Sequence, residues 1–428
     1  MMSNFRKSLV LVLVIATAIP VSLAVAQNAT VDRTLSVYQV LPADMITGKH
    51  YRIVDPVVNY AGLDGFTIES DYGTYDAYGQ LMLRIRLREI MALAALHDLS
   101  GKKAGAGGAG TEGKKQAKTV VNIGLHPIKS AGSISRGVLN RFKKFGRNIK
   151  EDVKLVRSDM TPKEKSAVYA SRWLKVDEAR LRWAGKLNID PYTSNEQLQA
   201  ELDRVATADA TGKIGARLLI PSIPTDSKIG SVHGLVTKYD LQQLIKYNSK
   251  QLKKMGANKS DIEYFLSMEQ YNPTSATIMV ELLYGFKDVS NFLALFQQAM
   301  TVESDVEALF FIESTLMALW YHQEQSKLTQ MLLETGIPAG TTRDGRVVVF
   351  AAVDFPHWSD ELAAVVTDLQ SAYGSVSPYR ELLLAGQGSG SFTTQVRKLG
   401  WSMKTDIRTA YLPSFTWAIT DEQLQKEK

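Results

Sequence analysis

The chain contains no cysteine among its 428 residues. Disulfide bonds, thiolate metal ligands and a cysteine nucleophile are therefore excluded. Histidine is scarce, with six in the chain, and none occurs in the H-E-x-x-H pattern of zinc hydrolases. A G-x-S-x-G nucleophile turn is also missing. We therefore expect neither a bound metal nor a cofactor.

A complete phosphate-binding loop is missing as well, although Gly108–Lys115 comes close to one. Gly113 and Lys114 stand at the required spacing, but Lys115 occupies the position where the loop needs a Ser or Thr hydroxyl for magnesium. The surrounding segment consists almost entirely of Gly, Ala and Lys, so its composition predicts a flexible linker instead.

Long hydrophobic runs are absent except for one at the start of the chain. Arg6 and Lys7 precede an apolar run, Leu9–Leu23, which ends in the small-residue pattern of Ala24–Ala26. This pattern predicts a secretory signal peptide that is cleaved after Ala26, and an uncleaved anchor is the alternative. We expect an exported protein, periplasmic or extracellular, without a transmembrane span in the mature chain and with membrane association left open.

The remaining sequence predicts a mainly α, multidomain protein. A hairpin is expected where FTIES and TYDAY flank Asp71-Tyr72-Gly73, followed by a helix over 79–99. Leu83, Ile85 and Leu87 alternate with arginines at the start of this helix, which is a competing strand period. Capping patterns and short joints predict stacked helical hairpins between 238 and 334.

The C-terminal region has a different pattern. Strand-like RVVVFAAVDF, ELLLAG and WSMKTDI alternate with a helix that starts near Ser359 and with the short helix FTTQVRKL. This alternation predicts a small α/β unit with parallel strand pairs. The expected parts of the chain are the signal peptide 1–26, a β-hairpin plus helix at 27–99, a flexible linker at 100–118, a basic amphipathic helix and helical region at 119–212, a helical repeat-like domain at 213–336, and the α/β unit at 337–428.

Positive charge is concentrated in one segment. Residues 100–157 carry fourteen Lys and Arg against three acidic residues, a net charge of +11, whereas the whole chain carries +6. Within it, the apolar residues between Ile134 and Val156 recur at helical spacing, and basic residues occupy the opposite side. The predicted contact residues of this basic amphipathic helix (about 128–157) are Arg136, Arg141, Phe142, Lys143, Lys144, Phe145, Arg147, Lys150 and Lys154.

Three hypotheses describe what the basic amphipathic helix contacts. Its apolar side could pack on the helical body, which leaves the basic side in solvent. It could instead lie on an anionic membrane surface or contact an envelope partner, as interfacial helices with a basic face do. Nucleic acid or another polyanion is the third partner, and no nucleic-acid recognition fold is visible in the sequence.

Candidate catalytic residues come from position alone. Asp354 and His357 follow the first predicted strand of the α/β unit, and Ser389 follows the second. Open α/β sheets bind ligands beyond the carboxyl ends of their strands. These three side chains are therefore a candidate nucleophile set, a ligand-binding crevice at the same place is an alternative, and a purely structural unit is a third.

Two further stretches, LMLRIRLREIMALAALHDLS and HPIKSAGSISRGVLNRFKKFGR, lie on either side of the linker. Together with LNIDPYTSNEQLQAELDRVA they resemble an arrangement in secreted bacterial envelope proteins to which no activity is assigned. The resemblance covers roughly 64–212. It implies an exported envelope protein in which the basic segment is a regular feature.

These observations favour a binding or scaffolding module of the cell envelope over an enzyme. The basic amphipathic helix is its expected contact element. The alternative is a hydrolase or small-ligand-binding protein that uses the crevice near Asp354 and His357.

Overall fold

The structure, a computed structural model, describes residues 33–104, 173, 176–210, 228–332 and 334–412. The predicted signal peptide, the basic amphipathic helix and all of the linker beyond residue 104 lie outside these ranges.

The fold is mixed α/β, so the prediction of a mainly α protein is wrong. The described residues are 52% helix and 18% strand, and they form fourteen helices and two sheets of six and five strands. The sequence indicated one hairpin at the N-terminal end and three strands at the C-terminal end. Both proved to be parts of larger sheets.

The N-terminal sheet is antiparallel and is built around the long strand β5. Its order is β1-β4-β5-β3-β2. Strands β4 and β3 pair with different parts of one edge of β5, and β6 pairs with the opposite edge. Two short helices, α1 and α2, lie in the connection between β1 and β2. The bounds are β1 Arg33–Leu35, α1 Val37–Val40, α2 Ala43–Ile46, β2 Thr47–Gly48, β3 Tyr51–Ile53, β4 Val57–Tyr60, β5 Leu63–Ser70 and β6 Gly73–Tyr78.

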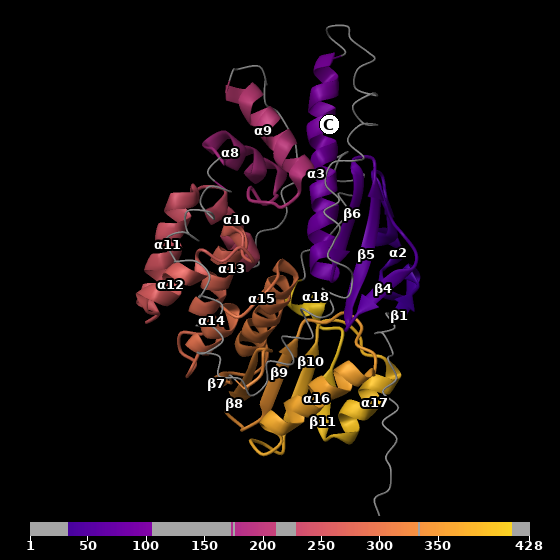
Figure 1. The fold of residues 1–428 in the computed structure, drawn as a ribbon, viewed down its shortest axis with the longest axis vertical. Coiled ribbons are helices and arrows are strands. Elements are labelled where there is room, and N and C mark those ends of the chain that lie inside the picture. The colour runs from indigo at the N-terminus through magenta and orange to yellow at the C-terminus, as the bar shows by residue number, and fades with distance from the viewer. Residues whose placement is uncertain (1–32, 105–172, 174–175, 211–227, 333, 413–428) are drawn as a thin grey trace, which may run out of the picture. The chain divides into compact units, whose positions relative to one another are not determined.

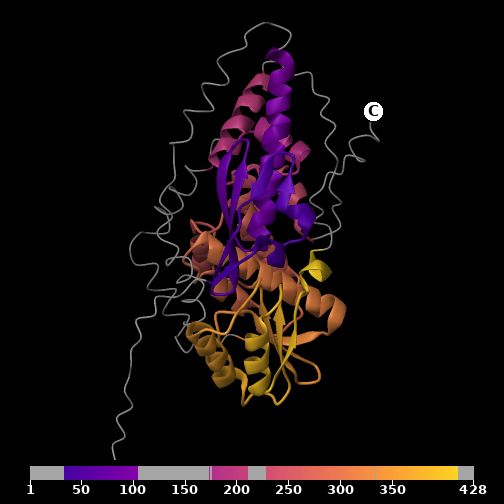
Figure 2. The ribbon, with the colours of Figure 1, turned by 90° about the vertical axis from the view of Figure 1, so that its right-hand side faces the viewer.

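Helix α3 (Gln80–Ala104) comes directly after β6, which confirms the predicted helix and extends it by five residues. Leu83, Leu87 and Ile90 are buried in one cluster with Phe66 and Ile68 of β5. The apolar residues therefore share one side of a helix, and the alternating pattern at its start does not form a strand. Figures 1 and 2 show α3 lying along this sheet.

The middle of the described chain is helical. Helix α13 contacts α10, α11 and α15 and so lies at the centre of this region. The helices of this region alternate between long and short. The bounds are α8 Glu178–Leu187, α9 Glu196–Ala210, α10 Lys228–Val236, α11 Leu241–Lys254, α12 Lys259–Phe265, α13 Pro273–Tyr284, α14 Leu293–Ala299, α15 Asp305–Trp320 and a π-helical turn, η2, Tyr321–Gln325.

The C-terminal sheet has the order β11-β10-β9-β8-β7. Strands β9, β10 and β11 are parallel, as predicted, whereas β7 and β8 are antiparallel additions that the sequence did not indicate. Since β7 begins at residue 328, the sheet starts before the expected boundary at 337. The bounds are β7 Leu328–Leu332, β8 Ala339–Thr342, β9 Val347–Ala351, α16 Asp360–Tyr373, β10 Arg380–Leu384, α17 Gly390–Lys398, β11 Trp401–Lys404 and α18 Arg408–Tyr411.

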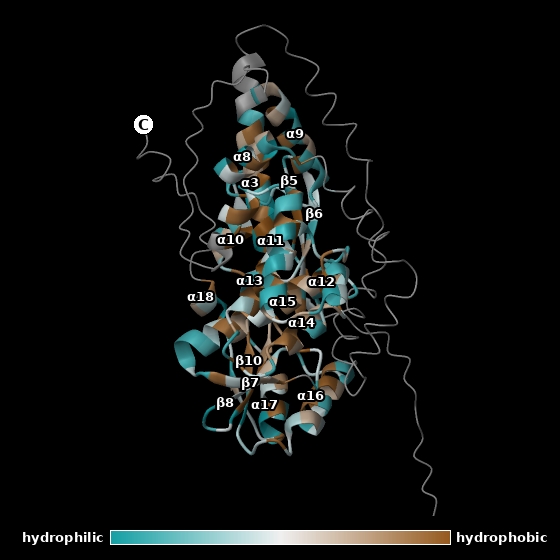
Figure 3. Ribbon diagram, turned by 90° about the vertical axis from the view of Figure 1, so that its left-hand side faces the viewer, coloured by the Kyte–Doolittle hydropathy of each residue, from teal (hydrophilic) through white to brown (hydrophobic). Residues whose placement is uncertain are grey.

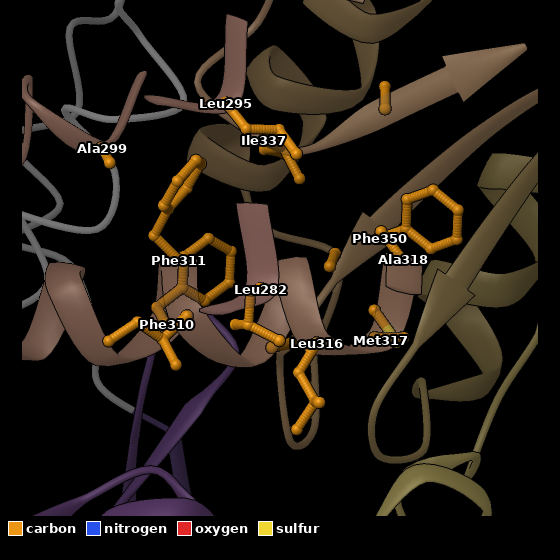
Figure 4. Packing of buried hydrophobic residues seen from close by; sticks show 14 of the residues in the cluster. Leu282, Leu295, Ala299, Phe310, Phe311, Leu316, Met317, Ala318, Ile337 and Phe350 are labelled. Atoms are coloured by element: carbon orange, nitrogen blue, oxygen red, sulfur yellow. The ribbon is translucent and has the colours of Figure 1, made fainter. Parts of the chain in front are cut away.

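One large apolar core joins the helical region to the C-terminal sheet. It extends from Leu63 and Leu81 near the N-terminal sheet, through α13 and α15, to β9 and Leu412. Figure 4 shows Phe311 and Met317 of α15 among its members, with Phe350 of β9 close by. In Figure 3 the helices carry both hydrophobic and hydrophilic residues, as expected for helices with one buried side. Within the described ranges, no helix is both long enough and apolar enough to cross a membrane.

Candidate functional site

The carboxyl ends of β9, β10 and β11 are where the sequence placed a candidate site. The chain passes through this sheet in one direction, from β7 at one edge to β11 at the other, and the strand order never reverses. Figure 1 shows α16 and α17 on the same side of the strands, and α15 contacts β9. Ligand crevices in open α/β sheets form at the point where the strand order reverses, so the topology of this sheet does not predict a crevice.

The β4–β5 turn lies against the end of β9. Ala61 and Gly62 have φ angles of 51° and 95°, as in the two-residue turns that join paired strands. The Gly62 carbonyl accepts hydrogen bonds from the main-chain N–H groups of Asp354 (2.7 Å) and Phe355 (3.0 Å). Residues from the N-terminal sheet therefore fill the space just past β9.

Asp354 is fully enclosed at this position. Its side chain has no exposed surface, and its Oδ1 accepts a hydrogen bond of 2.7 Å from Nη2 of Arg408. Its Oδ2 accepts from the main-chain N–H of Asp64 at 3.0 Å, and the N–H of Gln80 lies 3.3 Å from both oxygens. Gln80 is the first residue of α3, so Asp354 places a negative charge at the positive end of that helix.

Arg408 connects Asp354 to a second buried carboxylate. Its Nε donates to Oε1 of Glu313, on α15, at 2.7 Å, and the Tyr411 hydroxyl donates to the same oxygen at 2.8 Å. Burial alone would lower the pKa of Arg408, but Glu313 and Asp354 together raise it well above its ordinary value. Burial, and next the charge of Glu313, raise the pKa of Tyr411 well above its ordinary value, so the phenol stays neutral.

Asp64 is the third buried carboxyl group of the cluster, with 1% of its surface exposed. Its Oδ1 accepts a hydrogen bond of 2.7 Å from the amide of Asn59, whereas the buried Oδ2 has no hydrogen-bond partner among the described residues. Burial, and next the charge of Asp354, raise the pKa of Asp64 to about 8, against the opposing effects of Asn59 and Arg408. At neutral pH this carboxyl group is therefore mostly protonated.

These residues form the candidate site, which we call the buried charge cluster. Its members come from five separate parts of the chain and meet where the N-terminal sheet, α3, α15 and the C-terminal sheet adjoin. They are Asp64, Arg84, Glu313, Asp354, Arg408 and Tyr411.

The structure gives two of the predicted catalytic residues structural partners. Asp354 holds Arg408 and the start of α3, as described above. Ser389 is 7% exposed, and its Oγ accepts a hydrogen bond from the N–H of Phe392 and so caps α17. His357 is half-buried, three residues beyond Asp354. The nucleophile set stays a prediction, and the engagement of both Asp354 oxygens weighs against it.

The structure does not test the predicted contact residues of the basic amphipathic helix. All nine contact residues of the basic amphipathic helix, from Arg136 to Lys154, lie outside the described ranges. Among the residues that are described, no group of three His, Asp or Glu side chains is arranged to hold a metal ion.

Sequence reasoning missed Asp64, Glu313 and Arg408. Glu313 could have been noticed, because it is the single acidic residue within the apolar stretch ALFFIESTLMALW of α15. A buried carboxylate of that kind requires a partner, and a distant arginine is the usual one. Nothing in the sequence identifies which arginine.

Comparison of the chain with protein-family models, with curated proteins and with solved structures found no match.

Proposed function

We propose that this chain is an exported binding or scaffolding protein of the bacterial cell envelope. In this proposal the basic amphipathic helix at about 128–157 is the contact element, and its partner is an anionic membrane surface or an envelope protein. The apolar start of the sequence, with its cleavage pattern, supports export.

The observation that carries the proposal is that other parts of the chain cover the carboxyl ends of the parallel strands in the C-terminal sheet. The place where a parallel α/β sheet would bind a ligand is filled by the β4–β5 turn, the start of α3 and Arg408 of α18. This arrangement favours a structural role for the C-terminal unit over a hydrolase or a ligand crevice. Recognition is therefore better sought at the segment with the most concentrated charge, residues 100–157.

Vesicle co-sedimentation of residues 27–428 tests the proposal. We expect binding to vesicles that contain phosphatidylglycerol, weaker binding at high salt, and none to pure phosphatidylcholine. Each basic residue near an anionic surface contributes about 1 kcal/mol, so reversing four of them should weaken binding by roughly a thousandfold. The variant carries Lys143→Glu, Lys144→Glu, Arg147→Glu and Lys150→Glu.

A matched control changes the net charge equally on α11, where four lysines are exposed. It carries Lys246→Glu, Lys250→Glu, Lys253→Glu and Lys254→Glu. If binding depends on the basic amphipathic helix, this control keeps most of its affinity. Equal losses in both variants would show a general charge effect, and no binding of the unaltered chain to anionic vesicles would refute the membrane contact.

A further inference from the structure

Two buried carboxyl groups, Asp64 and Asp354, meet at the junction of the N-terminal sheet and the C-terminal sheet. We propose that this pair binds one proton and acts as a pH-sensitive latch, which holds the β4–β5 turn and the start of α3 against the end of β9 and loosens when the proton leaves. The inference does not depend on the proposed function.

The charge balance of the cluster calls for one proton. Asp64, Glu313 and Asp354 are acidic, and their basic neighbours are the buried Arg408 and the half-buried Arg84. Three carboxylates against two guanidinium groups leave one negative charge in excess. An unbalanced charge in a protein interior is costly, and groups in that position neutralise by binding or releasing a proton.

The hydrogen bonds identify Asp64 as the proton carrier. Asp354 accepts from Arg408 and from main-chain N–H groups, and Glu313 accepts from Arg408 and Tyr411, so each of these two carboxyl groups has at least two hydrogen-bond donors. Asp64 has a single side-chain donor, Asn59, and its buried Oδ2 has none. The raised pKa of Asp64, about 8, agrees with this assignment.

The groups that face Asp64 account for the direction of the switch. From β4 the amide of Asn59 donates to it, from the end of β9 it faces the carboxylate of Asp354, and from α18 it feels Arg408. The main-chain N–H of Asp64 also donates to Asp354. When Asp64 ionises, two carboxylates repel each other across the contact that joins the two sheets.

The sign of the pH effect is set by linkage. The pKa of Asp64 is raised above its ordinary value of 3.8, so its contribution to stability is complete below that value and is lost as pH rises through about 8. If opening of the latch exposes Asp64 to water, the opening equilibrium increases about tenfold per pH unit between roughly pH 5 and 8 and then levels off.

Amide hydrogen exchange measures this opening directly. The reporters are the N–H groups of Asp354 and Phe355, which donate to Gly62, and the N–H of Gln80 at the start of α3. Their protection factors, corrected for the intrinsic pH dependence of exchange, should fall about tenfold per pH unit from pH 5.5 to 7.5 in the unaltered chain. The N–H of Phe350, inside β9, should show a smaller change.

Asp64→Asn supplies a neutral group of the same shape and should make these protection factors independent of pH. Asp98→Asn removes an exposed carboxylate from α3 and should leave the pH dependence unchanged. If the protection factors of Asp64→Asn depend on pH as they do in the unaltered chain, the latch is refuted. It is also refuted if the protection factors of neither protein depend on pH.

A second measurement does not require local opening. Calorimetric unfolding at pH 7 in buffers of different ionisation enthalpy gives the number of protons released. The unaltered chain should release about one proton more than Asp64→Asn, because Asp64 is protonated when folded and ionised when unfolded. If Asp64→Asn fails to fold, infrared detection of a protonated buried carboxyl group in the unaltered chain, lost by about pH 9, decides the question in its place.

Discussion

Arg408 neutralises two buried carboxylates at once. Its guanidinium group lies 2.7 Å from Glu313 and 2.7 Å from Asp354, and all three residues are at most 4% exposed. A buried ion pair adds little net stability over apolar groups of similar size, because both partners lose their hydration. Removing one partner is different, since the other charge then stays buried without compensation.

We therefore predict that Arg408→Met lowers the free energy of unfolding by about 3–5 kcal/mol, as measured by urea denaturation at pH 7. Methionine keeps much of the apolar stem but leaves Glu313 and Asp354 unpaired. The control is Arg52→Met, which breaks an exposed pair with Glu69 and should cost at most about 1 kcal/mol. Equal losses in the two variants would contradict the role assigned to Arg408.

The sequence located one member of this cluster but not its partners. Asp354 was identified because it comes after a buried strand, and it does lie at the carboxyl end of β9. Its hydrogen-bond partners Asp64 and Arg408 are 290 and 54 residues away along the chain. Contacts of that separation leave no spacing pattern in a single sequence, so the site could be placed but its chemistry could not be predicted.

Helix α3 is also fixed by a buried carboxylate in its middle. Glu89 is 3% exposed and forms an ion pair of 2.7 Å with Arg86. It also accepts hydrogen bonds from the hydroxyl of Thr193 and the side-chain amide of Asn195. Asn195 in turn accepts from the N–H of Leu198 at the start of α9. One carboxylate thus joins α3 to the loop that begins α9.

Glu89→Ala should lower the free energy of unfolding by about 2–4 kcal/mol, because it leaves Thr193, Asn195 and Arg86 without their buried acceptor. Limited proteolysis should then cut within 188–196 faster than in the unaltered chain. Glu263→Ala, which removes an exposed i,i+4 pair with Lys259, should cost less than about 0.5 kcal/mol. Unchanged stability in Glu89→Ala would show that the loop is held by other contacts.

Elements with a strong period of their own were predictable, and elements defined by their neighbours were not. Helix α3 and strand β9 were found because their apolar residues recur at helical spacing or form a continuous run. Strands β2, β7 and β8 have two to five residues of mixed polarity, such as AGTT in β8. Such segments become strands because of the partner beside them, which explains why the fold class was misjudged.

At the scale of the whole molecule, the C-terminal sheet depends on chain segments that precede the expected boundary at 337. Strand β7 completes the sheet at one edge, and α15 covers β9 and contributes Glu313 to the buried charge cluster. The same apolar core also contains Leu63 and Leu81 from the N-terminal region. A boundary drawn where the strand pattern begins therefore cuts through a sheet and exposes a core.

Two fragments test this dependence. The fragment 337–428 keeps four of the five strands but lacks β7 and α15, so we expect no cooperative thermal transition in its far-ultraviolet circular dichroism. The fragment 305–428 restores both elements, together with Glu313 as a partner for Arg408, and should unfold cooperatively at a lower temperature than residues 27–428. The remaining difference reflects the missing β4–β5 turn and α3, which in the whole chain cover the end of β9. A cooperative transition of 337–428 alone, at the midpoint of the full chain, would show instead that this unit folds independently and that its contacts with α15 and β5 add no stability.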